Sequence, residues 1–256
     1  MIRDGQTVTL ALHKALAGKV TYGVNNYAPR RLFRLLDRLV AGGWNLSSSG
    51  SEGGRIVLSF DDGYAHLVDF LPELISGYGG SPILFVPTAW IGRTNSWDYS
   101  HRLCPAQHLD LIQIKELASQ GIEIGSHGRG HVDLTGLSER DLRYELESSR
   151  GDLEDILGRA VTSISYPFGR FNDTVTETAA AAGYREGYSM RFPTSYDGPL
   201  SRGRYPVYGF DTPWSVCQKL SQGSTYYLSR ALSAVIGNLS RGTGLLNRMR
   251  GHRHGY

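Results

Sequence analysis

The sequence predicts a single α/β domain in which parallel strands wind into a barrel. Strand-like and helix-like segments alternate along most of the chain. The helix-like segments are long enough to connect neighbouring strands as crossovers, and such connections imply parallel pairing. The length of 256 residues also fits one α/β barrel, a class that often reaches this size without dividing into domains.

Each element has its own signal in the sequence. Residues 8–13 form a β-like run at the front, and Pro29 begins a helix whose apolar residues repeat with helical spacing up to Val40. Further strands are expected over residues 55–60, 82–86, 122–126, 161–165 and 184–189. Helices are expected between them over residues 65–76, 109–119, 138–158 and 173–182. The third of these helices begins at Ser138, which with Asp141 resembles a capping box, and it ends near Gly158.

Two adjacent carboxylates and two spaced histidines are the strongest functional signal. Asp61 and Asp62 follow an apolar run, and His127 and His131 follow another. Taken alone, an Asp-Asp-Gly segment is usually a turn, and two histidines four residues apart are usually a surface pair. Both segments, however, follow predicted strands, whose carboxyl ends form the catalytic edge of a parallel α/β fold.

These residue types together indicate a particular chemistry. One carboxylate and two histidines are the protein ligands of an open catalytic zinc site. A second carboxylate beside the ligand can accept a proton from the attacking water. The pattern therefore predicts metal-assisted hydrolysis.

A third segment, Ser165–Gly169, again follows a predicted strand, although alone it would be an ordinary strand-to-helix turn. Together the three segments resemble the first three motifs of the polysaccharide deacetylases, the chitooligosaccharide-deacetylase homology domain of carbohydrate esterase family 4. The resemblance extends from about Arg55 to Tyr188. It implies a distorted (β/α)7 barrel and a metal-dependent deacetylase.

The resemblance also implies a role for each motif residue. Asp61 corresponds to the catalytic base, and Asp62, His127 and His131 correspond to the three metal ligands. The backbone N–H of Tyr166 corresponds to a group that stabilises the tetrahedral oxyanion. Zinc is the expected ion, although cobalt, nickel and iron suit the same ligands.

The third motif departs from the family pattern at its first residue. Many relatives begin this motif with an arginine that braces the base, and this sequence has Ser165 there. Arg204 and Arg170 are candidate replacements. The alternative for both is a solvated surface arginine, because arginine is rarely buried without a partner.

The general acid is expected in an unusual place. Relatives usually carry a Leu-x-His motif near the C-terminal end, and none follows Gly169. His13 instead ends the front β-like run, as in the subgroup that deacetylates poly-N-acetylglucosamine, in which the last strand is permuted to the N-terminus. We therefore expect His13 to be the acid, whereas in the alternative it only begins a loop.

Substrate-binding residues are expected around the active edge. The segment 92–105 has no clear periodicity and carries Trp97 and Tyr99, whose rings are suited to stacking on sugars. The third motif adds Pro167 and Phe168, and Arg204 is a further candidate contact.

The last part of the chain differs in charge from the rest. We expect the catalytic barrel over residues 1–215 and a basic helix and tail over residues 216–256, since no acidic residue follows Asp211. This segment suits peripheral contact with an anionic membrane, or alternatively a helix that caps the barrel before a disordered tail. The net charge of +3 is too small to indicate a nucleic-acid partner. Residues 1–7 do not resemble a signal region, so the expected location is the cytoplasm or the inner face of a membrane.

The combined prediction is a metal-dependent hydrolase that removes acetyl groups from N-acetylated amino sugars in a polysaccharide, an oligosaccharide or a lipid-linked glycan. An amidase or deformylase acting on a non-sugar amide is the nearest alternative within the fold. An inactive glycan-binding protein is another, since the motif-three arginine and the C-terminal Leu-x-His are absent. A purely structural metal would leave the adjacent Asp61 unexplained. The oligomeric state is not predicted.

Overall fold

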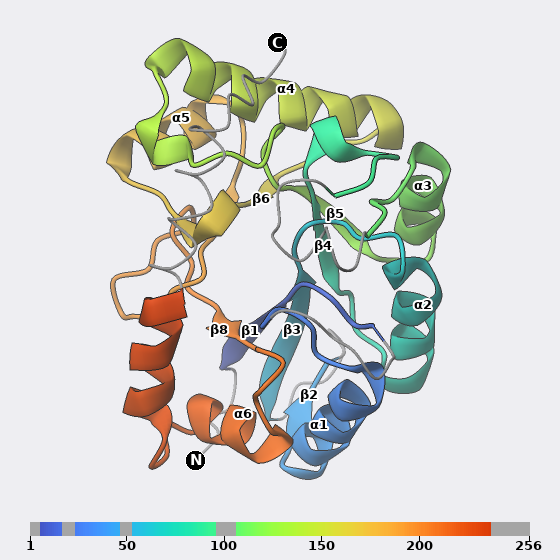
Figure 1. Ribbon diagram of the computed structural model, residues 1–256, viewed down its shortest axis with the longest axis vertical. Helices are drawn as coiled ribbons and strands as arrows, with labels where there is room; N and C mark the ends of the chain where they lie inside the picture. The colour runs from blue at the N-terminus through green and yellow to red at the C-terminus, as the bar shows by residue number, and fades with distance from the viewer. Residues whose placement is uncertain (1–5, 17–23, 47–52, 96–105, 237–256) are drawn as a thin grey trace.

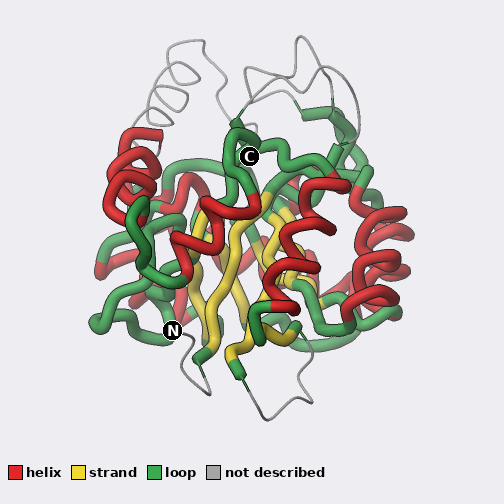
Figure 2. The backbone as a smooth tube through the Cα atoms, turned by 90° about the horizontal axis from the view of Figure 1, so that it is seen from below, coloured by secondary structure: helices red, strands yellow, loops and turns green. Residues whose placement is uncertain are grey.

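Parallel strands form the centre of the molecule, and helices cover the outside of the sheet, as Figure 1 and Figure 2 show. The computed structural model describes residues 6–16, 24–46, 53–95 and 106–236. Named strands in these ranges pair in parallel in the order β7-β6-β5-β4-β3-β1-β8, and β2 pairs with β3 off this path. The curled sheet and its helices confirm the predicted distorted (β/α)7 barrel.

The strands and helices alternate along the chain much as their sequence signals predict. The strands are β1 (Thr7–Leu12), β2 (Trp44–Asn45), β3 (Gly54–Phe60), β4 (Ile83–Val86), β5 (Glu123–Ser126), β6 (Ser163–Ser165), β7 (Glu186–Tyr188) and β8 (Tyr205–Pro206). The helices are α1 (Pro29–Ala41), α2 (Leu67–Tyr78), α3 (Leu111–Ser119), α4 (Glu139–Leu157), α5 (Asp173–Ala181) and α6 (Pro213–Leu220). The predicted ends of α4 are confirmed, because the Ser138 side chain accepts the Asp141 N–H and Gly158 adopts a left-handed φ of 66°.

The first strand lies inside the sheet, between β3 and β8. β1 runs parallel to β3 with Leu12 opposite Phe60, and on its other side it pairs with β8. The Asp61 N–H continues this ladder by donating to the Leu12 carbonyl at 2.9 Å. The residues that follow β1 and β3 therefore leave the sheet side by side at its carboxyl edge.

The barrel core continues beyond the boundary expected after residue 215. That boundary falls inside α6, whose Val216 and Leu220 belong to the hydrophobic core and which packs against α1. The Lys219 side chain is buried, and its Nζ donates to Asp211 Oδ2 at 2.6 Å and to the Pro206 carbonyl at 2.9 Å. These bonds tie α6 to β8, so the division at residue 215 does not match a structural boundary.

A further helical stretch, residues 226–236, follows α6. Tyr226 is buried in the core, whereas the apolar side chains of Tyr227, Leu228 and Val235 are exposed. The basic tail after residue 236 lies outside the described residues, so the membrane contact stays a prediction. Among the described residues, no helix combines the length and the hydropathy of a membrane span.

Replacing Lys219 with methionine is expected to lower the free energy of unfolding by about 3 kcal/mol, because removing one partner leaves the Asp211 carboxylate buried without its cation. Urea denaturation followed by circular dichroism measures this change. Lys115→Met, at an exposed site on α3, is the matched control and should stay within about 0.5 kcal/mol of the wild type. Equal stability of the two variants would show that the buried ion pair contributes nothing.

Candidate active site

The two strands β3 and β5 bring a carboxylate and two imidazoles together at the carboxyl edge of the sheet. Asp62 Oδ1 lies 3.5 Å from His127 Nε2 and 3.3 Å from His131 Nε2. One ligand atom from each of the three residues lies within 4.8 Å of the other two. The predicted convergence of these segments therefore exists in the fold.

The chemistry of this triad fits a divalent cation. Asp62 Oδ1 is buried and accepts no hydrogen bond from any residue that the structure describes. The His127 ring donates from Nδ1 to the Ser165 carbonyl at 2.6 Å, so its Nε2 is the lone-pair nitrogen and lies toward Asp62. A ligand histidine held in this way by a backbone carbonyl is usual in metal sites, and two imidazoles with one carboxylate suit zinc, cobalt, nickel or iron.

The backbone at this site is strained. Asp62, His131 and Phe168 adopt left-handed φ values of 71°, 55° and 59°, a backbone conformation that residues other than glycine rarely adopt. Such conformations cost on the order of 1–3 kcal/mol each and gather at functional sites, where the surrounding structure holds them. The strain supports a functional interpretation of the three segments that carry these residues, which follow β3, β5 and β6.

Two buried side chains fix the backbone around Asp62 and the loop between His127 and His131 by hydrogen bonds. No signal in the sequence identifies either of them. His108, which is buried and stacks on Tyr64 at 5.0 Å, donates from Nδ1 to the Asp62 carbonyl at 2.7 Å. Glu145, buried in the middle of α4, accepts the N–H groups of Arg129 and Gly130 at 2.9 and 2.8 Å. The first fixes the Asp62 turn, and the second fixes the loop between the two histidines.

Asp61 lies beside the triad in a closed network of hydrogen bonds. Arg204 donates from Nη1 to Oδ1 of Asp61 at 2.8 Å and from Nη2 to Oδ2 at 2.7 Å, a bidentate pair. Ser165 Oγ donates to Asp61 Oδ2 at 3.1 Å and accepts from Arg204 Nη2 at 2.8 Å. The remaining Arg204 bonds reach the Ser59 hydroxyl, the Ser189 carbonyl and the Met190 sulfur.

This network keeps Asp61 ionised. Burial by itself would raise the pKa of Asp61, but the charge of Arg204 and then that of His127 outweigh it and lower the pKa to about 2. The carboxylate is therefore available to accept a proton over the whole physiological pH range.

Arg204, and not Arg170, is the arginine that braces Asp61. It is completely buried, so both the surface alternative and the expected substrate contact are wrong for this residue. Arg170 instead pairs with Asp133 and is half-buried on another part of the edge. Ser165, which stands where the motif-three arginine was expected, contacts both Asp61 and Arg204 through its hydroxyl, and Arg204 supplies the cation beside Asp61.

His13 directly follows β1 and leaves the sheet at the same edge as Asp61. Its pKa is lowered by burial, and the nearby charges of Asp62 and Asp61 oppose that change only in part. The charges of both aspartates act on the imidazole, so His13 lies within the range of their electric field. Its role as the acid stays a prediction.

Tyr166 does not present the N–H group that was expected of it. That N–H donates to the Tyr188 carbonyl at 2.9 Å and so belongs to the pairing between β6 and β7. The Tyr166 side chain is buried and donates to the Leu200 carbonyl at 2.8 Å. The expected oxyanion role is therefore wrong, because a sheet hydrogen bond already uses the donor.

The next candidate in the same segment is Phe168. No hydrogen bond of its N–H occurs among the described residues, and its ring lies 4.8 Å from the His131 imidazole. Pro167, also expected near substrate, is buried. Trp97 and Tyr99 lie outside the described residues.

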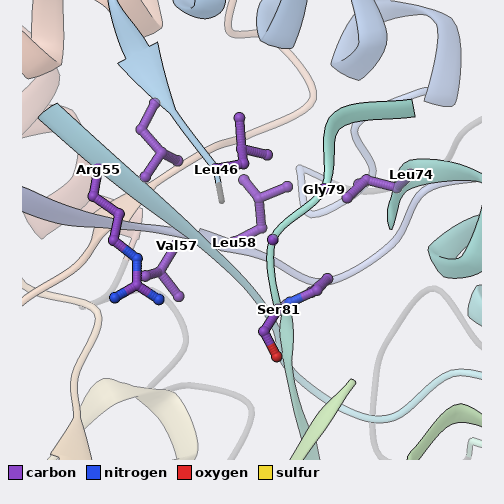
Figure 3. Close-up of a pocket in the computed structure, with 10 residues that line it drawn as sticks. Leu46, Arg55, Val57, Leu58, Leu74, Gly79 and Ser81 are labelled. Atoms are coloured by element: carbon purple, nitrogen blue, oxygen red, sulfur yellow. The ribbon is translucent and has the colours of Figure 1, made fainter. Parts of the chain in front are cut away.

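A small cavity at the other end of the barrel is not a substrate site. Figure 3 shows it between the start of β3, with Arg55 and Leu58, and the end of α2, with Leu74 and Gly79. Its volume of about 10 Å³ holds at most one water molecule. The candidate catalytic residues Asp61 and Asp62 follow the opposite end of β3.

The fold and the site together define a class of protein. The family model of the polysaccharide deacetylases matches residues 49–187, and the chain belongs to this family. Among individual proteins, it is similar to YxkH of Bacillus subtilis, which is named after the same family, with 30% identity over 155 residues, 60% of this chain and 50% of that protein. It is also similar to a chitin deacetylase of Arthroderma benhamiae, with 29% identity over 136 residues, 51% of this chain and 32% of that protein.

Solved structures share the fold at lower identity. The Streptococcus pyogenes deacetylase PplD superimposes with a TM-score of 0.69 and 21% identity, covering 84% of this chain and 98% of that one. IcaB from Ammonifex degensii gives a TM-score of 0.68 with 20% identity, covering 84% and 96%. The chain spans half or less of the length of the two curated relatives, so activity, substrate and partners are taken up as proposals.

Proposed function

We propose that this chain is a metal-dependent hydrolase that removes acetyl groups from N-acetylated amino sugars. The observation that carries the proposal is the Asp62–His127–His131 triad with the ionised Asp61 beside it. Membership of the polysaccharide deacetylase family supports a sugar substrate. Zn²⁺ is the proposed ion, with Co²⁺, Ni²⁺ or Fe²⁺ as alternatives that the same ligands accept.

The proposed reaction assigns one task to each group. When bound by Asp62, His127 and His131, a divalent cation supplies Lewis-acid polarisation of the acetamide carbonyl and lowers the pKa of the attacking water. Asp61 accepts a proton from that water as its oxygen bonds to the carbonyl carbon. His13 gives a proton to the amide nitrogen as the C–N bond breaks, which releases acetate and a free amino sugar.

The oxyanion requires a donor besides the cation. We assign this task to the Phe168 N–H, because the Tyr166 N–H is used by the sheet and Phe168 lies against the ligand His131. A preorganised donor of this kind contributes about 3 kcal/mol to stabilising the transition state. The left-handed conformation of Phe168 is the local backbone feature that would aim this group.

The proposal also covers the kind of glycan and the place of the protein in the cell. The glycan is a polysaccharide, an oligosaccharide or a lipid-linked precursor, and the proposed location is the cytoplasm or the inner face of a membrane. The complete set of base and ligand residues favours an enzyme over a protein that only binds glycans.

Removal and return of the metal is the direct test. We expect acetate release from N-acetylglucosamine oligomers or lipid-linked amino sugars, loss of at least about 100-fold of the rate after chelation, and recovery with added zinc. Acetate and formate are measured in parallel, with O-acetylated glycans in the same panel. Formate release, or activity only on non-sugar amides, would replace the proposed substrate, and undiminished turnover without metal would remove the mechanism.

Replacing His13 with alanine is expected to lower kcat by about 100-fold while the metal content and the melting temperature stay close to those of the wild type. The loss arises because the leaving nitrogen no longer receives a proton from the enzyme. Substrates with a better leaving group, such as an acetylated aromatic amine, should lose much less activity. An equal loss on both kinds of substrate would mean that His13 acts by packing alone.

A further inference from the structure

A cavity of about 360 Å³ opens beside the candidate active site. It lies between the third-motif turn η4 (Pro167–Gly169), the segment 190–194 and the helical residues 226–236. Its volume is in the range of pockets that hold a small ligand or one sugar unit. The residues that matter for its chemistry are Phe168, Arg170, Met190, Arg191 and Arg230.

Two residues in the cavity wall also contact residues of the candidate active site. Phe168, in its wall, contacts the ligand histidine His131 with ring centroids 4.8 Å apart. Met190, also in its wall, has its sulfur 3.5 Å from Nη2 of Arg204, the arginine that holds Asp61. A glycan with one unit at the metal triad would therefore place a neighbouring unit at this cavity.

Three arginines line the cavity, and two of them form ion pairs with aspartates that do not line it. Arg170 pairs with Asp133, and Arg191 donates to Asp197 at 2.6 Å and to the Ser201 carbonyl at 2.7 Å. Neither aspartate is among the lining residues. Each guanidinium has five donors, so both arginines keep N–H groups for another acceptor after these bonds are made.

The third arginine carries an unbalanced charge. Arg230 lies on the same helix face as the buried Tyr226 and Ser233, and it lines the cavity with its own side chain exposed to solvent. It forms no ion pair among the described residues. Residues 212–256 contain no aspartate or glutamate, so no side chain in that stretch offers these arginines a carboxylate.

We propose that this cavity binds an anionic substituent, a carboxylate or a phosphate, on the glycan next to the amino sugar that is deacetylated. The inference rests on the proposed function and adds the substrate class: an acidic rather than a neutral glycan. Guanidinium groups bind both kinds of oxyanion through paired hydrogen bonds, and preorganised arginines lose less entropy in doing so. The apolar wall formed by Phe168 and Met190 suits the face of the sugar ring.

The test compares matched acidic and neutral substrates in the metal-loaded enzyme. For the carboxylate arm, a tetrasaccharide of alternating glucuronate and N-acetylglucosamine is compared with the neutral N-acetylglucosamine tetramer. For the phosphate arm, a disaccharide whose sugar next to N-acetylglucosamine carries a phosphate is compared with the same disaccharide without the phosphate. We expect the wild type to prefer the acidic member of one pair, and Arg230→Gln to lower that ratio of kcat/KM by about tenfold. Arg230→Lys should retain part of the preference, since it keeps the charge but not the paired donors.

Arg185→Gln is the control for loss of a positive charge. Arg185 is exposed just before β7, at the amino end of the strands, and its replacement should leave the ratio unchanged. Ratios near one in the wild type for both pairs, or equal ratios in the wild type and Arg230→Gln, would overturn the inference while leaving acetyl hydrolysis intact.

Calorimetry keeps the inference testable if no substrate is hydrolysed. Titration of the glucuronate tetrasaccharide into wild type and Arg230→Gln reports binding without turnover. Affinity that falls about tenfold in the variant supports the anionic site, and unchanged affinity overturns it. Absence of acetate release from every substrate would count against the proposed function and not against the cavity.

Discussion

Replacing Asp61 with asparagine is expected to lower kcat by about three orders of magnitude while the bound metal is retained. Asparagine has nearly the same shape, and its carbonyl oxygen can still accept one bond from Arg204. It cannot, however, take a proton from the attacking water. The proposed metal ligands Asp62, His127 and His131 are separate side chains, so the variant separates the proposed base from the ligands.

Turnover and metal content measured on the same preparation check this result. Asp69→Asn, at an exposed site on α2, is the matched control and should keep the wild-type rate. A variant with metal bound and a kcat within tenfold of the wild type would show that another group is the base. Loss of metal together with activity would instead place Asp61 among the groups that hold the cation.

The pH dependence of the unfolding free energy, compared between wild type and Asp61→Asn, tests the electrostatics of the buried network. The pKa of Asp61 is lowered from 3.8 to about 2, so its contribution to stability is complete above 3.8 and is lost as the pH falls through about 2. The shift corresponds to about 2 kcal/mol. The difference in unfolding free energy between wild type and Asp61→Asn should therefore be largest near pH 5 and should shrink toward pH 2.

The parts of the site that sequence could predict are those set by local order along the chain. Asp62, His127 and His131 each follow an apolar strand, and the carboxyl ends of parallel strands meet at one edge of the sheet. Their convergence follows from this rule without knowledge of distances. Helix α4 was similarly predictable, because Ser138 and Gly158 carry its start and its end.

The parts that sequence could not settle depend on pairing between distant segments. The Tyr166 N–H is used by β7, and no local pattern reveals which donors a neighbouring strand will take. Arg204 is brought to Asp61 by β8, a strand of two residues with no periodicity to identify it. Glu145 is one of many charged residues on α4. Only the packing of that helix against the loop between His127 and His131 distinguishes it from the others.

Replacing Arg204 with serine is expected to lower the free energy of unfolding by about 3–5 kcal/mol, because the Asp61 carboxylate stays buried without its cation. It should also reduce turnover, since Asp61 would lose both the bonds that orient it and the charge that keeps it ionised. Denaturant unfolding and steady-state kinetics on the metal-loaded protein measure the two effects. Arg204→Lys should recover part of the stability but less of the activity, because an ammonium group cannot make the bidentate contact.

The decisive variant moves the cation back to the position that many relatives use. Ser165 Oγ contacts both Asp61 and Arg204, so an arginine at position 165 would reach the space that Arg204→Ser vacates. The double variant Ser165→Arg/Arg204→Ser should therefore be more stable and more active than Arg204→Ser alone. Ser165→Arg in the presence of Arg204 should instead be destabilising, because two guanidiniums would compete for one carboxylate in a packed interior. If the double variant is no better than Arg204→Ser, the two positions are not equivalent, and the approach from β8 is itself required for a working base.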